Sequence, residues 1–184
     1  ETAFEQSSPG VHKGYDYSRS INPTREAFEN CIADLENGYK GYGFSSGVAA
    51  ISACVELLSP GDHIIAMDDL YGGSVRLFNE IKSLSQGIEI SYVDMTDTNN
   101  IKNAIKASTK MIFVETPTNP LLKIADLSKI AKLAKKEKIL TVCDNTFASP
   151  FNQKPINDGI DIVIHSATKY LGGHSDLIAG AMVI

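Results

Sequence analysis

A lysine next to two hydroxyl-bearing residues is the feature of this sequence with the clearest chemical potential. Ser166, Thr168 and Lys169 follow a short apolar run, residues 162–165. A lysine amine at such a place can form a Schiff base with a carbonyl group, and the nearby hydroxyls can bind a phosphate. The alternative is a solvated lysine at the start of a helix. Lysines are common, so this motif alone favours that alternative and needs support from other residues.

A second motif, Gly43-Phe44-Ser45-Ser46-Gly47, lies between a short and a long apolar segment. It fits a nucleophile elbow in which Ser45 is the nucleophile. It also fits an anion site, in which the free N–H groups of a helix's first turn face a phosphate. A plain helix cap without a ligand is the third interpretation. Dinucleotide-binding and P-loop motifs are excluded, because neither glycine pattern matches these residues.

Two further residues could contact an aromatic ligand. Asp144 ends a short apolar run, and a carboxylate there is costly to bury unless it is paired. It could pair with a protonated heterocyclic nitrogen, or it could cap the following turn. Tyr71 lies in a Gly-rich turn and could stack flat on an aromatic ring, or it could be an ordinary half-buried tyrosine. Neither residue alone indicates a ligand site, and both support one only together with Lys169.

The elements that must position these residues alternate along the chain, which predicts an α/β fold. The runs that suit buried strands are residues 62–68, 88–94, 111–115, 140–144 and 162–165. The helical candidates are residues 48–58, 75–85, 101–107 and 127–137. Such alternation is typical of right-handed βαβ units, so we expect three α/β/α layers around a mainly parallel sheet. Ligands bind outside the carboxyl ends of such strands, where the polar motifs cluster.

The N-terminal segment differs from the rest of the chain. Residues 1–20 are polar and aperiodic and predict an extended arm, whereas residues 21–184 predict one domain. Asn22 and Pro23 are typical of an N-cap and a first helical residue. Apolar residues then recur at helical spacing and predict one buried stripe: Phe28, Ile32, Leu35 and Tyr39. The chain begins without Met and ends on an apolar run, so we expect an excerpt of a longer protein.

Composition narrows the classes of function. The net charge of −5 offers no basic field for nucleic acid or anionic lipid. No run approaches the roughly 18 apolar residues of a membrane helix. Cys31, Cys54 and Cys143 lie in apolar segments without a C-x-x-C pair, so neither a disulfide framework nor a metal site is expected. We therefore expect a cytoplasmic protein that binds a small molecule.

Six motifs in order resemble the Cys/Met-metabolism family of pyridoxal-phosphate enzymes over essentially the whole chain. They are Tyr17-Ser18-Arg19-Ser20 with Asn22-Pro23-Thr24-Arg25, Ser46-Gly47-Val48-Ala49, Asp69-Leu70-Tyr71-Gly72-Gly73, Glu115-Thr116-Pro117-Thr118-Asn119-Pro120, Asp144-Asn145-Thr146-Phe147 and His165-Ser166-Ala167-Thr168-Lys169-Tyr170. The resemblance implies pyridoxal 5′-phosphate as cofactor and the large domain of the aspartate-aminotransferase (type I) fold. It also implies homotetramers, built as dimers of dimers with shared active sites, and a C-terminal domain absent from this chain.

The resemblance also implies roles for individual residues. Lys169 looks like the Schiff-base lysine and Asp144 like the partner of the pyridine nitrogen. Tyr71 resembles the ring that stacks on the cofactor and, with Lys169, would be catalytic. The implied phosphate-binding residues are Ser46, Gly47, Val48, Ser166 and Thr168. The residues implied near the cofactor or substrate are Asn119 and Arg76, together with Tyr17 and Arg19, which would reach the site of a neighbouring subunit.

The implied activity is cleavage or formation of a carbon–sulfur bond in a small sulfur amino acid. We expect γ-elimination of cystathionine to cysteine, 2-oxobutanoate and ammonia. The alternatives are γ-replacement to make cystathionine, its β-elimination, and γ-elimination of methionine, although Gly73 stands where enzymes of the last kind typically carry a cysteine. A serine hydrolase using Ser45, with Asp144 and His165 or His174, is the rival from another class. A non-catalytic scaffold of the same fold is the third possibility.

Overall fold

Seven strands form one sheet at the centre of the computed structural model, which describes residues 2–184. The strand order is β3-β9-β8-β7-β6-β4-β5. Neighbours from β8 to β5 are parallel, whereas β9 is antiparallel to both β8 and β3. The strands are β3 (Gly41–Phe44), β4 (His63–Met67), β5 (Glu89–Val93), β6 (Thr109–Glu115), β7 (Leu140–Asp144), β8 (Ile162–Ser166) and β9 (Gly180–Val183). The predicted mainly parallel α/β sheet is confirmed.

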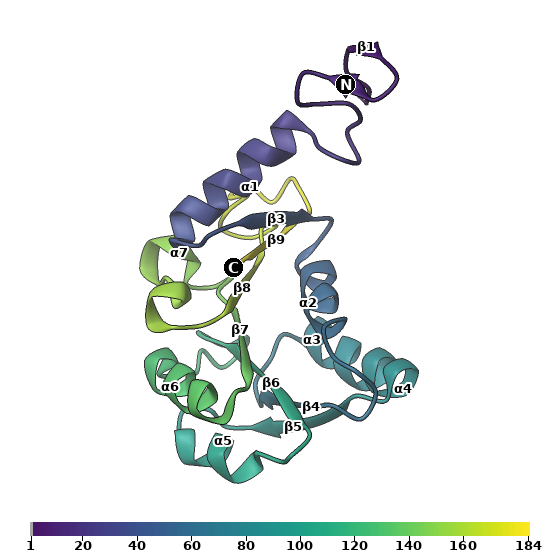
Figure 1. Cartoon of the computed structure of the whole chain (residues 1–184). Coiled ribbons are helices and arrows are strands. Elements are labelled where there is room, and N and C mark those ends of the chain that lie inside the picture. The colour runs from purple at the N-terminus through teal and green to yellow at the C-terminus, as the bar shows by residue number, and fades with distance from the viewer. Residues whose placement is uncertain (1) are drawn as a thin grey trace.

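Helices cover both faces of this sheet and give the three predicted layers (Figure 1). One face carries α2 (Gly47–Val55), α3 (Gly72–Arg76), a π-helical segment (Leu77–Lys82) and α4 (Ser83–Gln86). The other face carries α1 (Pro23–Glu36), α5 (Thr98–Ala104), α6 (Leu127–Glu137), α7 (Ser149–Asn152) and a 3₁₀ turn (Pro155–Asp158). Covered on both faces, β4 is buried along its whole length, which explains its continuous apolar sequence.

Helix α1 begins as predicted, but only the first half of its predicted apolar stripe faces the core. The Oδ1 of Asn22 accepts the N–H groups of Thr24 and Arg25, at 2.9 and 3.2 Å. Of the stripe, Phe28 packs against the core and Ile32 is buried, but Leu35 is 45% exposed and Tyr39, 92% exposed, lies beyond the end of the helix. Ala33 and Glu36 are buried beside Ile32 near the C-terminal end. Glu36 is therefore buried at a position that the apolar pattern of the sequence did not predict to face the core.

The helix predicted near residues 75–85 starts earlier and is less regular. α3, the π-helical segment and α4 follow one another without a break, and Gly87 ends them in a left-handed conformation, with φ of 67°. Phe78 is fully buried here and meets Phe113 of β6 edge-on, with 5.2 Å between the ring centroids. The early start puts Tyr71 at the N-terminal end of α3.

The N-terminal arm projects away from the domain, beyond the N-terminal end of α1 (Figure 1). It is more ordered than predicted, because β1 (Gln6–Ser8) and β2 (Val11–His12) form a small antiparallel hairpin. The hydroxyl of Tyr15 donates to Oε2 of Glu26 at 2.7 Å and ties the arm to α1. The arm thus carries its own local structure outside the main sheet.

Two further predictions concern the cysteines and membrane segments. Cys54 and Cys143 are buried, whereas Cys31 is exposed on α1, so the expected apolar setting is wrong for that residue. Within residues 2–184, no helix has the length and apolar character that a membrane crossing needs.

Candidate active site

A pocket of about 250 Å³ lies at the carboxyl ends of β6, β7 and β8 and at the start of α2. This is the edge of the sheet where strand-end residues were expected to meet a ligand. Nine predicted site residues line it: Ser46, Gly47, Val48, Tyr71, Asn119, Asp144, Ser166, Thr168 and Lys169. The fold therefore brings together residues that are far apart in sequence.

The first turn of α2 forms one wall of the pocket. Ser46 caps the helix, since its Oγ accepts the N–H of Ala49 at 3.1 Å. The N–H groups of Gly47 and Val48 have no acceptor within their own helix and carry its positive end. A Cβ on Gly47 would lie 2.8 Å from Cβ of Ser166, so glycine lets the helix start this close to β8. The arrangement is a site for an anion.

The two hydroxyl residues at the end of β8, Ser166 and Thr168, have different surroundings. Oγ1 of Thr168 donates to the carbonyl of Ala179 at 3.2 Å and accepts its N–H at 3.1 Å. This hydroxyl therefore joins the turn after β8 to the segment before β9. Ser166 lies beside Gly47, and its own N–H donates to Oγ1 of Thr146 at 2.8 Å. Both side chains line the pocket, but the Thr168 hydroxyl is already engaged with the backbone.

Two buried carboxyl groups, Asp144 and Glu115, line the same pocket, with 7% and 5% of their surface exposed. Burial raises the pKa of Asp144, while hydrogen bonds to its Oδ1 from the N–H and hydroxyl of Thr146 oppose that rise. Burial first, and then the charge of Asp144, raise the pKa of Glu115 to about 8. Two acidic groups that are costly to ionise together favour a ligand that brings a positive charge.

The sequence prediction did not assign Glu115 to the site. Its Oε2 accepts the N–H of Tyr71 and its Oε1 accepts the N–H of Asn119, each at 3.0 Å. The available signal was its place in the sequence, because Glu115, like Asp144, ends a buried strand. Other lining residues that were not assigned are Ile51, Thr146, Phe147 and Ile178.

The ring of Tyr71 lies over the first turn of its own helix. It is 47% exposed and lines the pocket. A Cβ on Gly73 would lie 2.4 Å from Cε1 of Tyr71, so the ring occupies space that any side chain at residue 73 would need. Gly72, in contrast, has nothing within 4 Å of the place of a Cβ.

Three predicted site residues do not line the pocket of their own chain: Tyr17, Arg19 and Arg76. Tyr17 and Arg19 lie on the projecting arm, where the guanidinium carbon of Arg19 is 5.3 Å from the centre of the Tyr17 ring. Arg76, in the last turn of α3, is exposed. The place of Arg76 near the substrate therefore stays a prediction.

The residues of the rival hydrolase do not assemble. Ser45 is exposed and does not line the pocket. His165 is buried, with its Nε2 2.5 Å from Oε1 of Glu36. Nδ1 of His174 faces the carbonyl of Gly172 at 3.0 Å. Among the described residues, neither histidine forms a hydrogen bond or ion pair with Ser45 or Asp144, so the fold offers no Ser–His–Asp triad.

Comparison with known proteins agrees with the fold. The family described as Cys/Met metabolism PLP-dependent enzyme matches residues 1–184. The chain is 56% identical over 183 residues to cystathionine beta-lyase of Coxiella burnetii, covering 100% of the chain and 47% of that protein. It is 49% identical over 182 residues to cystathionine gamma-lyase of Bacillus subtilis, covering 99% and 48%. The crystal structure of cystathionine gamma-lyase from Lactobacillus plantarum complexed with L-serine matches with a TM-score of 0.95 and 49% identity, covering 100% and 48%.

The fold is that of PLP-dependent enzymes of fold type I, as predicted. The chain belongs to the Cys/Met metabolism PLP-dependent enzyme family. It spans about half the length of the curated relatives it matches.

The side chains of the pocket fit pyridoxal 5′-phosphate. The start of α2 offers N–H groups to a phosphate, and the close approach of Gly47 to Ser166 forms the cradle. The buried carboxyl group of Asp144 suits a protonated ring nitrogen. Lys169 lines the same pocket and supplies an amine for an aldehyde.

Proposed function

We propose that the full-length protein is a PLP-dependent carbon–sulfur lyase that cleaves cystathionine by γ-elimination, with cysteine, 2-oxobutanoate and ammonia as products. The observation that carries the proposal is the convergence of Lys169, Asp144 and the anion-binding start of α2 on one pocket. Relatives named cystathionine beta-lyase and cystathionine gamma-lyase support the substrate.

The phosphate group would be held at the start of α2. Gly47 and Val48 would donate their backbone N–H groups, and Ser166 its hydroxyl. Hydrogen bonds to a charged group contribute roughly 1.5–3 kcal/mol each, so several of them fix the phosphate firmly. Ser46 keeps the helix start in place by capping it, and Thr168 holds the turn that carries Lys169 through its bonds to Ala179.

Asp144 and Tyr71 would hold the ring of the cofactor. When bound, pyridoxal phosphate supplies an electron-withdrawing ring that acidifies the α-hydrogen of an amino acid. Asp144 keeps a proton on the ring nitrogen, because its buried carboxylate is stabilised by a cation beside it. Tyr71 would stack on the cofactor ring, and Asn119 lines the same pocket.

Lys169 would both carry the cofactor and move protons. Its Nζ would hold the cofactor covalently in the absence of substrate. Once free, this amine would take a proton from the α-carbon of the substrate, pass it on, and then take one from the β-carbon. It would return a proton to the sulfur as the bond between the γ-carbon and sulfur breaks, and water would complete the release of 2-oxobutanoate and ammonia. General acid–base catalysis of this kind contributes about 10²–10⁴ in rate.

The covalent attachment is tested with full-length protein purified without added cofactor. Borohydride reduction, digestion and peptide mass spectrometry should find a pyridoxyl adduct on Lys169, and Lys169→Ala should lack it and lose turnover. An adduct on Lys123 or another lysine would overturn this role. Colourless protein that is labelled by a fluorophosphonate would instead favour the hydrolase, and colourless, unlabelled protein would favour a scaffold.

The direction of cleavage is tested with cystathionine as substrate. γ-Elimination yields cysteine and 2-oxobutanoate, whereas β-elimination yields homocysteine and pyruvate. β-Elimination is the second candidate, because the relative with 56% identity is named cystathionine beta-lyase. Mass spectrometry of the keto acid therefore decides between the two reactions.

The proposal includes an assembly and a compartment. Homotetramers, built as dimers of dimers, would let the projecting arm deliver Tyr17 and Arg19 to the phosphate site of a neighbouring subunit. A cytoplasmic location fits the two buried free cysteines.

A further inference from the structure

We infer that Glu115 is a positioning residue that holds Tyr71 and Asn119 at a fixed separation around the bound cofactor. The two residues lie on different segments, one after β4 and one after β6. The inference rests on the proposed function, because their separation matters for a ligand that both of them contact.

The geometry of Glu115 carries the inference. Its two carboxyl oxygens are divided between the two segments, Oε2 to the N–H of Tyr71 and Oε1 to the N–H of Asn119, each at 3.0 Å. Glu115 is the last residue of β6, which lies inside the sheet between β4 and β7. Both segments are thereby fixed relative to the sheet at the pocket itself. With 5% of its surface exposed, Glu115 has little access to water that could replace either bond.

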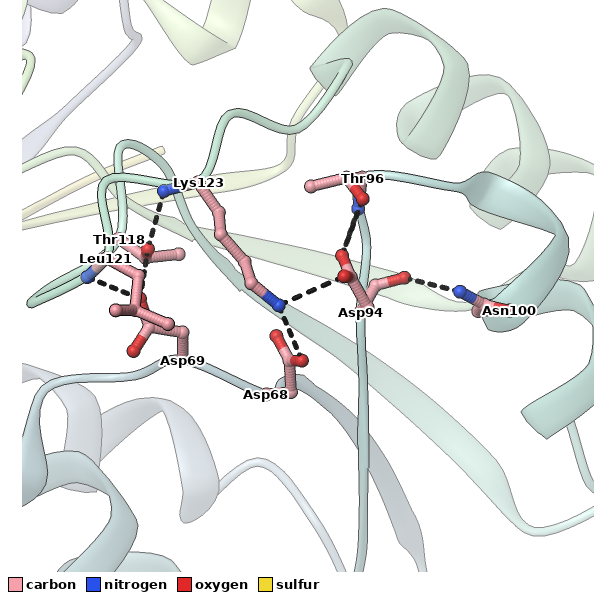
Figure 2. A network of polar contacts seen from close by, with 8 residues as sticks. All are labelled: Asp68, Asp69, Asp94, Thr96, Asn100, Thr118, Leu121 and Lys123. Carbon is pink, nitrogen blue, oxygen red and sulfur yellow. Dashed lines mark hydrogen bonds and ion pairs between the residues drawn. The ribbon is translucent and has the colours of Figure 1, made fainter.

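A second tie joins the same two segments farther from the pocket (Figure 2). Oδ2 of Asp69 accepts the hydroxyl of Thr118 and, at 2.8 Å, the N–H of Leu121. Both bonds end on one oxygen of Asp69. The tie brings the segment after β4 against the loop that carries Asn119, but neither bond reaches Tyr71 or Asn119 directly.

Lys123 adds an ion-pair network at the edge of this arrangement (Figure 2). Its Nζ lies 2.7 Å from Oδ2 of Asp68 and 3.0 Å from Oδ2 of Asp94. The side chains of Asp68 and Asp94 are 34% and 40% exposed, and ion pairs so open to water contribute little. The hydrogen bonds that hold the N–H groups of Tyr71 and Asn119 therefore come from Glu115.

The arrangement makes Glu115→Gln an informative change. A carboxyl group can accept both N–H groups whether it is ionised or protonated, because each of its oxygens keeps a lone pair. The glutamine amide has the same shape, but its nitrogen accepts no hydrogen bond and would face one N–H donor to donor. One of the two segments must then move away.

The experiment uses full-length protein from which the cofactor has been removed. Two affinities are measured by titration, that of pyridoxal phosphate from its visible absorbance, and that of inorganic phosphate from its competition. Visible circular dichroism of the bound cofactor reports how the ring is held. The matched control is Glu29→Gln, because Oε1 of Glu29 accepts the N–H of Gly43 at 2.9 Å, which a glutamine oxygen can still accept. The same oxygen lies 3.4 Å from Nε of Arg25, and an ion pair this open to water contributes little.

We expect Glu115→Gln to bind pyridoxal phosphate about tenfold more weakly, as the loss of one buried hydrogen bond predicts, and to change the circular dichroism. Inorganic phosphate affinity should stay unchanged, because its site at α2 is separate, and Glu29→Gln should match wild type in both affinities. Unchanged cofactor affinity and dichroism would overturn the inference. Equal weakening of both ligands would also overturn it, since Glu115 would then support the domain as a whole.

Two further results remain distinguishable. If wild-type protein binds no pyridoxal phosphate, the proposed function itself fails. If Glu115→Gln does not fold, Glu115→Asp keeps the carboxyl group but shortens the side chain by one methylene, so that it cannot reach both N–H groups, and the same two affinities decide. Weaker cofactor binding with unchanged phosphate binding would support the inference that Glu115 positions the two segments. Unchanged cofactor binding would overturn that inference.

Discussion

Glu115 and Asp144 are register partners at the carboxyl ends of the adjacent parallel strands β6 and β7. Adjacent strands lie about 4.8 Å apart, so two acidic side chains share the same small, buried region. Each group makes ionisation of the other more costly. A cationic ring nitrogen beside Asp144 would offset this repulsion. Binding of the cofactor should therefore stabilise the folded domain.

The raised pKa of Glu115 predicts a pH dependence of stability. Its pKa rises from 4.5 to about 8, so folding favours the protonated form. The stabilisation from this group is complete below about pH 4.5 and is lost as the pH rises through about 8. For cofactor-free full-length protein, we expect the free energy of unfolding in urea to fall across this window. Glu115→Gln should show a smaller fall, and identical pH profiles would contradict the raised pKa.

Asp144→Asn should separate cofactor binding from turnover. The asparagine keeps the shape but cannot stabilise a protonated ring nitrogen, while the phosphate site at α2 remains. A loss of about 3 kcal/mol corresponds to a kcat lower by about 100-fold or more, with the cofactor still bound. Asp161→Asn is the control, because Asp161 accepts the N–H and hydroxyl of Thr141 at the opposite end of β7. Near-normal kcat in Asp144→Asn would mean that Asp144 only caps its turn.

Two neighbouring glycines give a matched test of the Tyr71 ring. In Gly73→Ala the new methyl group would overlap the ring, at 2.4 Å from its Cε1, and must displace it. We expect cofactor affinity to fall about tenfold, the effect of losing about 1.4 kcal/mol of stacking. Gly72→Ala meets nothing within 4 Å and should leave the affinity unchanged. If both variants bind the cofactor like wild type, the ring position is not important for binding.

The proposed role of the arm can be tested by complementation. Arg19→Ala and Lys169→Ala, each as full-length protein, should both be impaired. In a mixed dimer, one site combines Lys169 of one subunit with Arg19 of the other and is intact. Co-refolding should therefore restore activity, with about half of the dimers mixed if pairing is random. Mixed dimers that form but stay inactive would place Arg19 in the site of its own subunit.

The sequence predicted the site better than it predicted the packing around it. Strand ends could be recognised from apolar runs followed by polar motifs, and this was enough to bring Lys169, Asp144 and Gly47 to one edge. Glu115 also ends such a strand, but its two hydrogen bonds to backbone N–H groups of distant segments could not be inferred from residue spacing.

Other differences have equally local causes. Leu35 was expected in the buried stripe of α1, but the inward position at that end belongs to Glu36, which meets His165 from a strand far along the chain. α5 begins at Thr98, before the predicted start at Ile101, because Asp97 caps it through the N–H of Asn99 at 2.9 Å. In both helices, a hydrogen bond of one side chain thus determined a feature that the apolar periodicity of the sequence did not predict.

The position of β9 between β3 and β8 has a consequence for how the chain folds during synthesis. β3 pairs with β9, and β9 with β8, so residues 41–44 have no neighbour in the sheet until residues 180–183 have been made. A chain leaving the ribosome can pair β4 with β5 and β6, then β6 with β7 and β7 with β8, while β3 still lacks its partner. The first of the seven strands to be translated is thus among the last to join the sheet, and the strand pairing with the largest sequence separation completes it.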